Sequence, residues 1–445
     1  MANDVIAAVA TPAGRGGVAV IRISGPSLRP LLANLVNADL VPRRATLARF
    51  RGANDTTIDQ GIALFFPGPQ SYTGEDVVEL QGHGGPVVVQ MLLARCLELG
   101  ARIAEPGEYT KRAFLNGRLD LAQAEGVADL INATTQEAAR CALRSLDGVF
   151  SEKIDQFVHT LTELRVLVEA TLDFPEEEID FVQKSGLSAR LTKLAAALQE
   201  VIDSSRQGSL LREGVHVVLA GHPNVGKSSL LNRLAGAERA IVTDIPGTTR
   251  DAIRESISIQ GVPLHIVDTA GLRDAEDPVE RVGIARSHDA ISKADIVLWV
   301  ADATRPETQI VDVGLIDRLA IDATRIFVLN KIDLAGESSP KDSASRLARV
   351  PVSAKSGQGM DGLAEEILRA AGWRSGEGVF LARARHLQAL NLGAKHLASA
   401  IDLLAQLEFC AEELRLAQVA LGSITGEVSA DDLLGKIFSQ FCIGK

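Results

Sequence analysis

The chain has 445 residues, a length that predicts about three domains with ample hydrophobic core. Its net charge of −11 excludes a protein coated in basic surface, so a nucleic-acid partner would need a local basic patch. The 4 cysteines show no CxxC spacing, which indicates neither a zinc site nor a disulfide framework and favours a reducing, cytoplasmic compartment.

The N-terminal segment, residues 1–118, predicts an α+β domain. Short β-rich runs at 18–23 and 62–66 alternate with Gly and Pro turns, and 87–99 has helical character. We find neither a cleavable leader nor a run of about eighteen apolar residues, so we expect neither export nor a membrane span. The first fifty-four residues carry many arginines and few acids, which fits either a nucleic-acid patch or a solubilising face. These arginines are Arg15, Arg22, Arg29, Arg43, Arg44, Arg49 and Arg51.

Two stretches with helical periodicity, 119–212 and 374–445, enclose a segment of α/β character at 213–373. Apolar residues keep helical spacing in the first stretch, as at Leu121, Ala124 and Ala128. The helical pattern returns after Trp373. We therefore predict that the α/β segment is inserted into a helical domain built from two chain segments. A switch on such an insert can move the helices that hold it.

Residues 221–228, with the sequence GHPNVGKS, fit the phosphate-binding loop pattern GxxxxGK[ST]. A buried-strand pattern at 215–220 precedes them and a helical pattern at 229–234 follows, which is the context that such a loop needs. Glycines let successive backbone N–H groups point at phosphates, while Lys227 supplies a charge and Ser228 a hydroxyl for Mg²⁺. We expect the nucleotide to be bound by Asn224, Val225, Gly226, Lys227, Ser228 and Ser229.

Four further segments follow in the order and spacing of a Ras-like GTPase. Asp268 follows a strand at 264–267 and takes the metal-facing position at a strand end. The segment 330–333, NKID, ends another strand, and Asp333 can accept from two donors of guanine that adenine does not offer, so we expect GTP rather than ATP. A switch loop is expected between the phosphate-binding loop and Asp268, with Thr249 reaching Mg²⁺ and the γ-phosphate. The residues expected from these segments are Thr243, Asp244, Ile245, Pro246, Gly247, Thr248, Thr249, Asp268, Thr269, Ala270, Gly271, Asn330, Lys331, Asp333, Ser353, Ala354 and Lys355.

The expected site lacks the glutamine that orients the attacking water in Ras-type enzymes, because Leu272 stands after the segment 268–271. Catalysis therefore needs another polar group, and the acidic segment 274–281 is the nearest source. Glu280 is the first candidate for the catalytic acid, with Arg250 and Arg273 as candidate charge stabilisers. Other acids of this segment, such as Glu276, fit equally well as solvating groups of a loop.

Near the C-terminus, residues 429–432, SADD, predict the N-cap of a last helix. Cys442 falls beyond the end of that helix. It has two interpretations, a small apolar filler or a functional thiol that reaches a pocket in another domain.

The chain resembles the tRNA-uridine modification GTPases of the MnmE (TrmE) family over essentially its whole length. The resemblance rests on strings more specific than the phosphate-binding loop, namely TPAGRGG at 11–17, GEDVVELQGHGGP at 74–86, RAFLNGRLDLAQAE at 112–125 and FCIGK at 441–445. It implies an α/β multidomain protein with an N-terminal tetrahydrofolate-binding-like and dimerisation domain at 1–118. A helical domain at 119–212 and 374–445 and an inserted Ras-like P-loop GTPase domain at 213–373 complete the expected architecture.

The resemblance also implies a K⁺-stimulated GTPase that forms a homodimer through its GTPase domains. K⁺ would be held by Asn224 and by switch oxygens at Thr243, Ile245 and Thr248, in the place of an arginine finger. Glu280 would position the water. In the N-terminal domain, 5-formyltetrahydrofolate would be bound by Arg22, Glu79, Arg118 and Lys445, with Cys442 beside the pocket.

The activity implied by the resemblance is the addition of an aminomethyl-type group to C5 of the wobble uridine in certain tRNAs. A flavoprotein partner of the MnmG (GidA) type would bring FAD and form a heterotetramer, and the chain shows no GxGxxG fingerprint of its own. Two alternatives stay open at this stage. One is a non-catalytic GTP switch such as a ribosome-assembly GTPase, and the other is a folate-binding enzyme whose GTPase is only regulatory.

Overall fold

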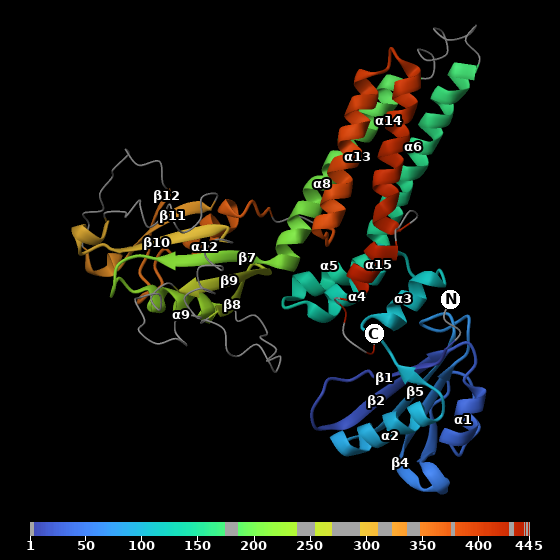
Figure 1. Cartoon of the computed structure of the whole chain (residues 1–445). Helices are drawn as coiled ribbons and strands as arrows, with labels where there is room; N and C mark the ends of the chain where they lie inside the picture. The colour runs from blue at the N-terminus through green and yellow to red at the C-terminus, as the bar shows by residue number, and fades with distance from the viewer. Residues whose placement is uncertain are drawn as a thin grey trace. The chain divides into compact units, whose positions relative to one another are not determined.

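The computed structural model describes residues 4–173, 186–237, 254–268, 294–309, 323–335, 348–374, 379–426, 431–439, 441 and 444. The chain divides into two compact units. The first unit comprises residues 1–128, 146–163 and 418–445, and the second comprises 129–145 and 164–417. Figure 1 shows the whole chain with its elements labelled. In the part that the structure describes, every helix is too short or too polar to cross a lipid bilayer.

The N-terminal part of the first unit is a six-stranded sheet of order β3-β4-β5-β2-β1-β6. Neighbouring strands are antiparallel except β1 and β6, which are parallel. The strands are β1 (Ile6–Val9), β2 (Gly16–Gly25), β3 (Thr46–Arg51), β4 (Thr57–Phe66), β5 (Asp76–Gly84) and β6 (Arg102–Ile103). Side chains alternate along β2, so that Ile21 and Ile23 are buried in the same core as Phe50 of β3.

Helices pack on this sheet as the sequence predicts. The short helix α1 (Arg29–Leu35) and the longer α2 (Pro86–Glu98) contribute Leu31 and Leu92 to the core. A 3₁₀ turn, η1 (Ala53–Asp55), joins β3 to β4. The predicted strands at 18–23 and 62–66 lie within β2 and β4, and the helix predicted at 87–99 is α2. The structure therefore confirms the α+β class of the N-terminal segment.

The two ends of the chain meet within the first unit. Helix α3 (Glu108–Leu115), the start of α4 (Leu121–Asn132) and the last helix α15 (Asp431–Phe438) share one apolar core. In this core Phe438 lies 6.5 Å from Phe114, centroid to centroid. Gly107, at φ +67°, begins α3 where an added Cβ would lie 2.7 Å from the carbonyl oxygen of Phe438. The close approach of α15 thus requires glycine there.

Helices make up most of the described residues between 129 and 213 and between 379 and 425, as the 3.6-residue spacing predicts. They are α5 (Gln136–Leu146), α6 (Val149–Asp173), α8 (Leu187–Glu213), α13 (Ala384–Asp402) and α14 (Leu407–Thr425). In the second unit α8 and α13 lie side by side (Figure 1). Asp129 accepts hydrogen bonds from Arg212 at the end of α8 (3.0 Å) and from Arg383 before α13 (2.8 Å). This nearly buried carboxylate thus ties the end of α8, just before β7, to the residue just before α13.

Within residues 213–373 the chain forms a second six-stranded sheet of order β12-β11-β10-β7-β9-β8. All neighbours are parallel except the edge pair β8 and β9. The strands are β7 (Val215–Ala220), β8 (Arg254–Ile259), β9 (Val262–Asp268), β10 (Ile296–Asp302), β11 (Thr324–Asn330) and β12 (Ala348–Pro351). Strand β10, IVLWVAD, is buried along its whole length, as expected of a parallel strand covered on both faces.

Helices and turns complete this doubly covered sheet. They are α9 (Lys227–Ala237), α12 (Met360–Ala370), η4 (Pro306–Gln309) and η5 (Ile332–Leu334). Apolar side chains of α9 and α12, such as Leu230 and Ile367, share a core with β7 and β10. The predicted order of strand, phosphate loop and helix is therefore confirmed, together with the multidomain α/β fold class.

Candidate functional site

The candidate site begins with the loop that joins β7 to α9, at the carboxyl end of the parallel sheet. Its conformation depends on two glycines with positive φ, +136° at Gly221 and +97° at Gly226. A Cβ at Gly221 would meet the carbonyl oxygen of Val300, and one at Gly226 would meet the side-chain nitrogen of Asn330. The loop thus lies against β10 and β11 at a distance that only glycine permits. Ligands of open α/β sheets bind at this edge.

Lys227 and Ser228 open helix α9. The nearly buried Lys227 donates from Nζ to the carbonyl oxygens of Gly221 (2.9 Å) and His222 (3.1 Å). Its ammonium therefore lies within the curve of the loop, while Ser228 and Ser229 in the first turn are exposed. The first backbone N–H groups of α9, a helix of 11 residues, point out of its N-terminus toward this loop. This arrangement provides a positive charge, a hydroxyl and helix-end donors for an anion.

Asn330, at the end of β11, links the phosphate-binding loop to the loop that follows β12. Its side-chain nitrogen donates to the carbonyl oxygen of Val225 (2.9 Å), and its side-chain oxygen accepts from the backbone N–H of Ala354 (3.0 Å). The residue is 2% exposed. A buried amide with both ends bonded has little freedom, so Asn330 holds the two loops in fixed register.

Asp333 and Ser353 form the next contact. The hydroxyl of the buried Ser353 donates to Oδ1 of Asp333 (2.7 Å), and it also accepts from the N–H of Ser356 (3.1 Å). Asp333 itself is exposed, as is Lys355. The structure thus presents an oriented carboxylate at the surface, with acceptor capacity for the two N–H donors of a guanine edge.

The sequence analysis missed Asp302. This residue ends β10, the strand between β7, which leads into the phosphate-binding loop, and β11, which ends at Asn330. Its Oδ2 accepts from Nζ of Lys331 (2.6 Å), and its Oδ1 accepts from the N–H and hydroxyl of Thr304 (2.9 and 2.7 Å). Burial opposes ionisation of this carboxyl, but the bonds from Lys331 and Thr304 outweigh it and hold its pKa below the ordinary value. The available signal was a carboxylate at the end of an apolar strand, the same signal that identified Asp268.

Of the other predicted site residues, the structure describes the backbone position of Asp268. Asp268 ends β9 opposite Leu219 of the neighbouring strand β7, at the same sheet edge as the phosphate loop. The remaining ones lie outside the described residues, so their roles stay predictions. They are Thr243, Asp244, Ile245, Pro246, Gly247, Thr248, Thr249, Arg250, Thr269, Ala270, Gly271, Arg273, Glu280, Cys442 and Lys445.

A second candidate site lies on the N-terminal sheet, where Arg22 of β2 faces Glu79 of β5 across the strand pair. Nε and Nη2 of Arg22 donate to the same Glu79 oxygen, at 3.0 and 2.8 Å. The guanidinium lies 5.7 Å from the ring centre of Tyr72 and 5.8 Å from that of Tyr109. Cross-strand pairing over 57 residues thus builds a charged pair beside aromatic rings.

The C-terminal end of the chain reaches this pair. Nη1 of Arg22 donates to the carbonyl oxygen of Gly444 (3.4 Å). Gly444, at φ +98°, packs so closely on β1 that an added Cβ would lie 2.5 Å from the carbonyl oxygen of Val9. Arg118 is exposed, and its Cγ lies near Gly74 in the loop before β5. The structure therefore joins Arg22, Glu79 and the terminal segment.

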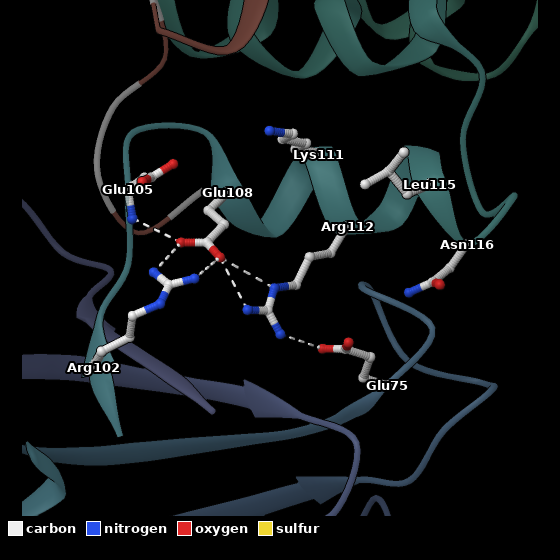
Figure 2. Close-up of a pocket in the computed structure, with 8 residues that line it drawn as sticks. All are labelled: Glu75, Arg102, Glu105, Glu108, Lys111, Arg112, Leu115 and Asn116. Carbon is white, nitrogen blue, oxygen red and sulfur yellow. Dashed lines mark hydrogen bonds and ion pairs between the residues drawn. The ribbon is translucent and has the colours of Figure 1, made fainter. Parts of the chain in front are cut away.

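A pocket of about 240 Å³ borders α3 in the same unit (Figure 2). Arg102, Glu108 and Arg112 point toward one another there, whereas Lys111 points away from them. Arg102 donates to both oxygens of Glu108 (2.8 and 2.6 Å), and Arg112 donates to Glu108 (2.9 Å) and Glu75 (2.9 Å). Four of the charged residues that line this pocket are thus paired with one another within the fold, namely Glu75, Arg102, Glu108 and Arg112.

Comparison with known proteins identifies relatives along the whole chain. Residues 5–118 match the family model described as "GTP-binding protein TrmE N-terminus", and residues 121–442 match "MnmE helical domain". The tRNA modification GTPase MnmE of Azoarcus sp. (strain BH72) is 58% identical over 443 residues, which cover 99% of this chain and 98% of the relative. The protein of that name from Dechloromonas aromatica (strain RCB) is 57% identical over 449 residues and is covered completely, as is this chain.

Among solved structures, the G domain of the T. maritima FeoB iron transporter is 28% identical to this chain. The match covers 35% of this chain and 98% of that one, with a TM-score of 0.28.

Proposed function

The chain belongs to the tRNA modification GTPase MnmE family and is an enzyme that hydrolyses GTP, and we propose that it does so with K⁺ stimulation to support wobble-uridine modification. The full proposal is that it acts with an FAD-containing partner of the MnmG type and a folate one-carbon unit. Together they add an aminomethyl-type group to C5 of the wobble uridine of certain tRNAs. The relatives' own name supports tRNA as the substrate.

The observation that carries the GTP part is the oriented Asp333 carboxylate. Ser353 fixes one of its oxygens, and Asn330 fixes the loop on which it stands to the phosphate loop. A carboxylate held in this way accepts from the ring N–H and the exocyclic amine of guanine. A base without those donors would leave the carboxylate unpaired, which costs binding free energy.

The described residues fit the two cations of the proposal. Mg²⁺ prefers oxygen ligands, and the exposed Ser228 hydroxyl at the start of α9 provides one, with Thr249 as the proposed second. For K⁺ the exposed amide oxygen of Asn224 stands on the phosphate loop, with Thr243, Ile245 and Thr248 as further proposed ligands. Positive charge at this place would neutralise the charge that spreads over the transferring phosphoryl group.

Glu280, Arg250 and Arg273 remain the proposed catalytic and organising groups of the switch segments. Glu280 would orient the water, because Leu272 has no polar side chain.

The N-terminal pair supports the folate part of the proposal. Glu79 has a second carboxylate oxygen beyond the one bonded to Arg22, and a carboxylate can accept the paired N–H donors of a pterin ring. The rings of Tyr72 and Tyr109 flank Arg22 and supply apolar faces beside the charges. Arg118 and Lys445 are proposed to bind the folate carboxylates, and Cys442 to act beside the pocket. The folate would supply the one-carbon unit.

Dependence of GTP turnover on the monovalent cation tests the proposal on purified protein. We expect severalfold faster hydrolysis in KCl than in NaCl at equal ionic strength, because K⁺ takes the place of an arginine finger. Asn224→Ala should remove the difference between the salts. Asn232→Ala, which changes an exposed amide on α9, is the matched control and should keep it. Equal turnover in both salts by the unaltered protein would refute the K⁺ assignment.

A further inference from the structure

Lys331 makes two contacts that tie the end of β10 to the phosphate loop. Its Nζ donates to the carbonyl oxygen of Asn224 (2.9 Å) and to Oδ2 of Asp302 (2.6 Å). Asn330 binds the next carbonyl oxygen along, that of Val225. Two successive carbonyls of the phosphate loop are thus held by two successive side chains of the segment 330–333.

Asp302 is the buried anchor of this arrangement. It is 1% exposed, whereas the Lys331 side chain is 30% exposed. Both oxygens of Asp302 are bonded, Oδ2 to Lys331 and Oδ1 to Thr304, and its backbone N–H donates to the hydroxyl of Thr308 (3.0 Å). Arg305 is a second cation near Asp302 among the described residues, but it is 54% exposed and its Nε lies 4.0 Å from Oδ2. Lys331 is therefore the principal partner of the Asp302 charge.

Backbone strain coincides with this contact. Asn224 has φ +62° and Lys331 has φ +67°, in the left-handed region that side chains with a Cβ adopt at a cost. The Lys331–Asn224 bond joins these two strained residues directly. Strained residues persist where the surroundings fix them, and they gather at ligand sites. Burying a carboxylate such as Asp302 costs free energy unless it is well paired, so this ion pair suggests a role in addition to packing of the fold.

We propose that Asp302 is a positioning residue of the nucleotide site, which fixes the Lys331 ammonium and through it the Asn224 corner of the phosphate loop. The inference rests on the proposed guanine nucleotide site. It assigns to Asp302 the geometry of the loop and leaves base identity to Asp333. A change at Asp302 should therefore weaken all guanine nucleotides alike without altering the preference for guanine over xanthine.

Fluorescence titration of the full-length protein with mant-GDP and mant-GTP tests the role of Asp302. We expect Asp302→Asn to weaken both nucleotides about ten- to a hundredfold, because a donor amide or a neutral oxygen replaces the charged acceptor of Lys331. Asp295→Asn is the matched control. Asp295 precedes the same strand at its opposite end, where it accepts from the N–H of His216 (2.8 Å). This control should bind both nucleotides as the unaltered protein does.

A double-mutant cycle with Lys331→Met separates positioning from a general structural effect. In the Lys331→Met background, Asp302→Asn should weaken nucleotide affinity by less than about twofold, because Asp302 then has no ammonium to position. An equal cost in both backgrounds would overturn the proposal, and so would unchanged affinity of Asp302→Asn. If Asp302→Asn does not fold, Thr304→Val tests the same anchor, with an expected loss of about three- to tenfold. Failure of the unaltered protein to bind mant-GDP would instead refute the nucleotide site itself.

Discussion

Both units contain a network of buried charges, and the two networks differ in what their members contact. In the first unit Arg112 and Glu108 are each 8% exposed, and they bond to Asp4, Glu75 and Arg102. In the second unit the buried Asp302 pairs with Lys331, which is 30% exposed and bonds to the exposed Asn224. In the first network charges pair with other charges, although Arg102 and Asp4 at its edge are 42% and 37% exposed. The second network instead ends on a backbone carbonyl oxygen of the phosphate-binding loop.

The comparison shows that pairing of charges alone does not mark a binding site. A saturated network contributes to stability, because each of its groups would be costly to leave buried without its partners. A network that holds the backbone of a ligand-binding loop, as Lys331 does at Asn224, can transmit its geometry to a ligand. The pocket of Figure 2 is lined by charged side chains, yet Glu75, Arg102, Glu108 and Arg112 among them are already paired with one another.

Breaking the saturated network should have the largest effect on stability. We expect Arg112→Met to lower the free energy of unfolding of the first unit by about 3–5 kcal/mol, because it leaves Glu108 and Glu75 with fewer partners. Thermal and urea unfolding of the full-length protein would measure this. Arg95→Met is the control, since Arg95 pairs with the exposed Glu98 (3.0 Å), and it should cost less than about 1 kcal/mol. Similar costs for the two variants would contradict the distinction.

The effect of Arg112→Met should depend on pH. Burial alone would raise the pKa of Glu108, but bonds from Arg102, Glu105 and Arg112 hold it below its ordinary value of 4.5. A lowered carboxyl pKa stabilises the fold above the unfolded pKa, and this stabilisation is lost as pH falls through the folded pKa. The difference between the unaltered protein and Arg112→Met should thus be full at pH 7 and should shrink below pH 4.5.

Asp333 bonds to Ser353 and belongs to neither network, so a change there should alter ligand specificity instead. We expect Asp333→Asn to shift the relative affinity from guanine toward xanthine nucleotides by about 2–4 kcal/mol, because the charged acceptor for two guanine donors is lost. Competition titrations with GDP and XDP would measure it. Gln358→Ala, an exposed position in the same region that is not assigned to the site, should leave the ratio of the two affinities nearly unchanged. An unchanged GDP affinity in Asp333→Asn would show that Asp333 does not recognise the base.

The elements of the GTPase segment could be predicted from sequence because its signals are local. A buried strand, a glycine-rich loop and a helix follow one another at 215–237, and the segment 330–333 ends its own strand. The roles of Asp302 and of the Arg112 network could not be predicted in this way. Each depends on partners brought together from distant parts of the chain, such as Arg112 and Asp4, 108 residues apart.

The N-terminal site needed the family resemblance. Arg22 and Glu79 are ordinary charges in sequence, and only the register of β2 against β5 pairs them. Gly444 reaches Arg22 across 422 residues, which no local pattern predicts. The motif FCIGK suggested that the terminus matters, and the contact of Gly444 with Arg22 gives a physical reason for that expectation.

The central claim is that one chain combines GTP hydrolysis with a modification step. Mass spectrometry of wobble uridines tests this claim most directly. Cells that lack this protein would be complemented with the unaltered chain or with Cys442→Ser. We predict that the unaltered chain restores the C5-modified wobble uridine and that Cys442→Ser does not, although the purified variant keeps normal GTP turnover. Modified uridine in the cells without the protein would contradict the account. Full restoration by Cys442→Ser would show that the Cys442 thiol is not needed for the modification.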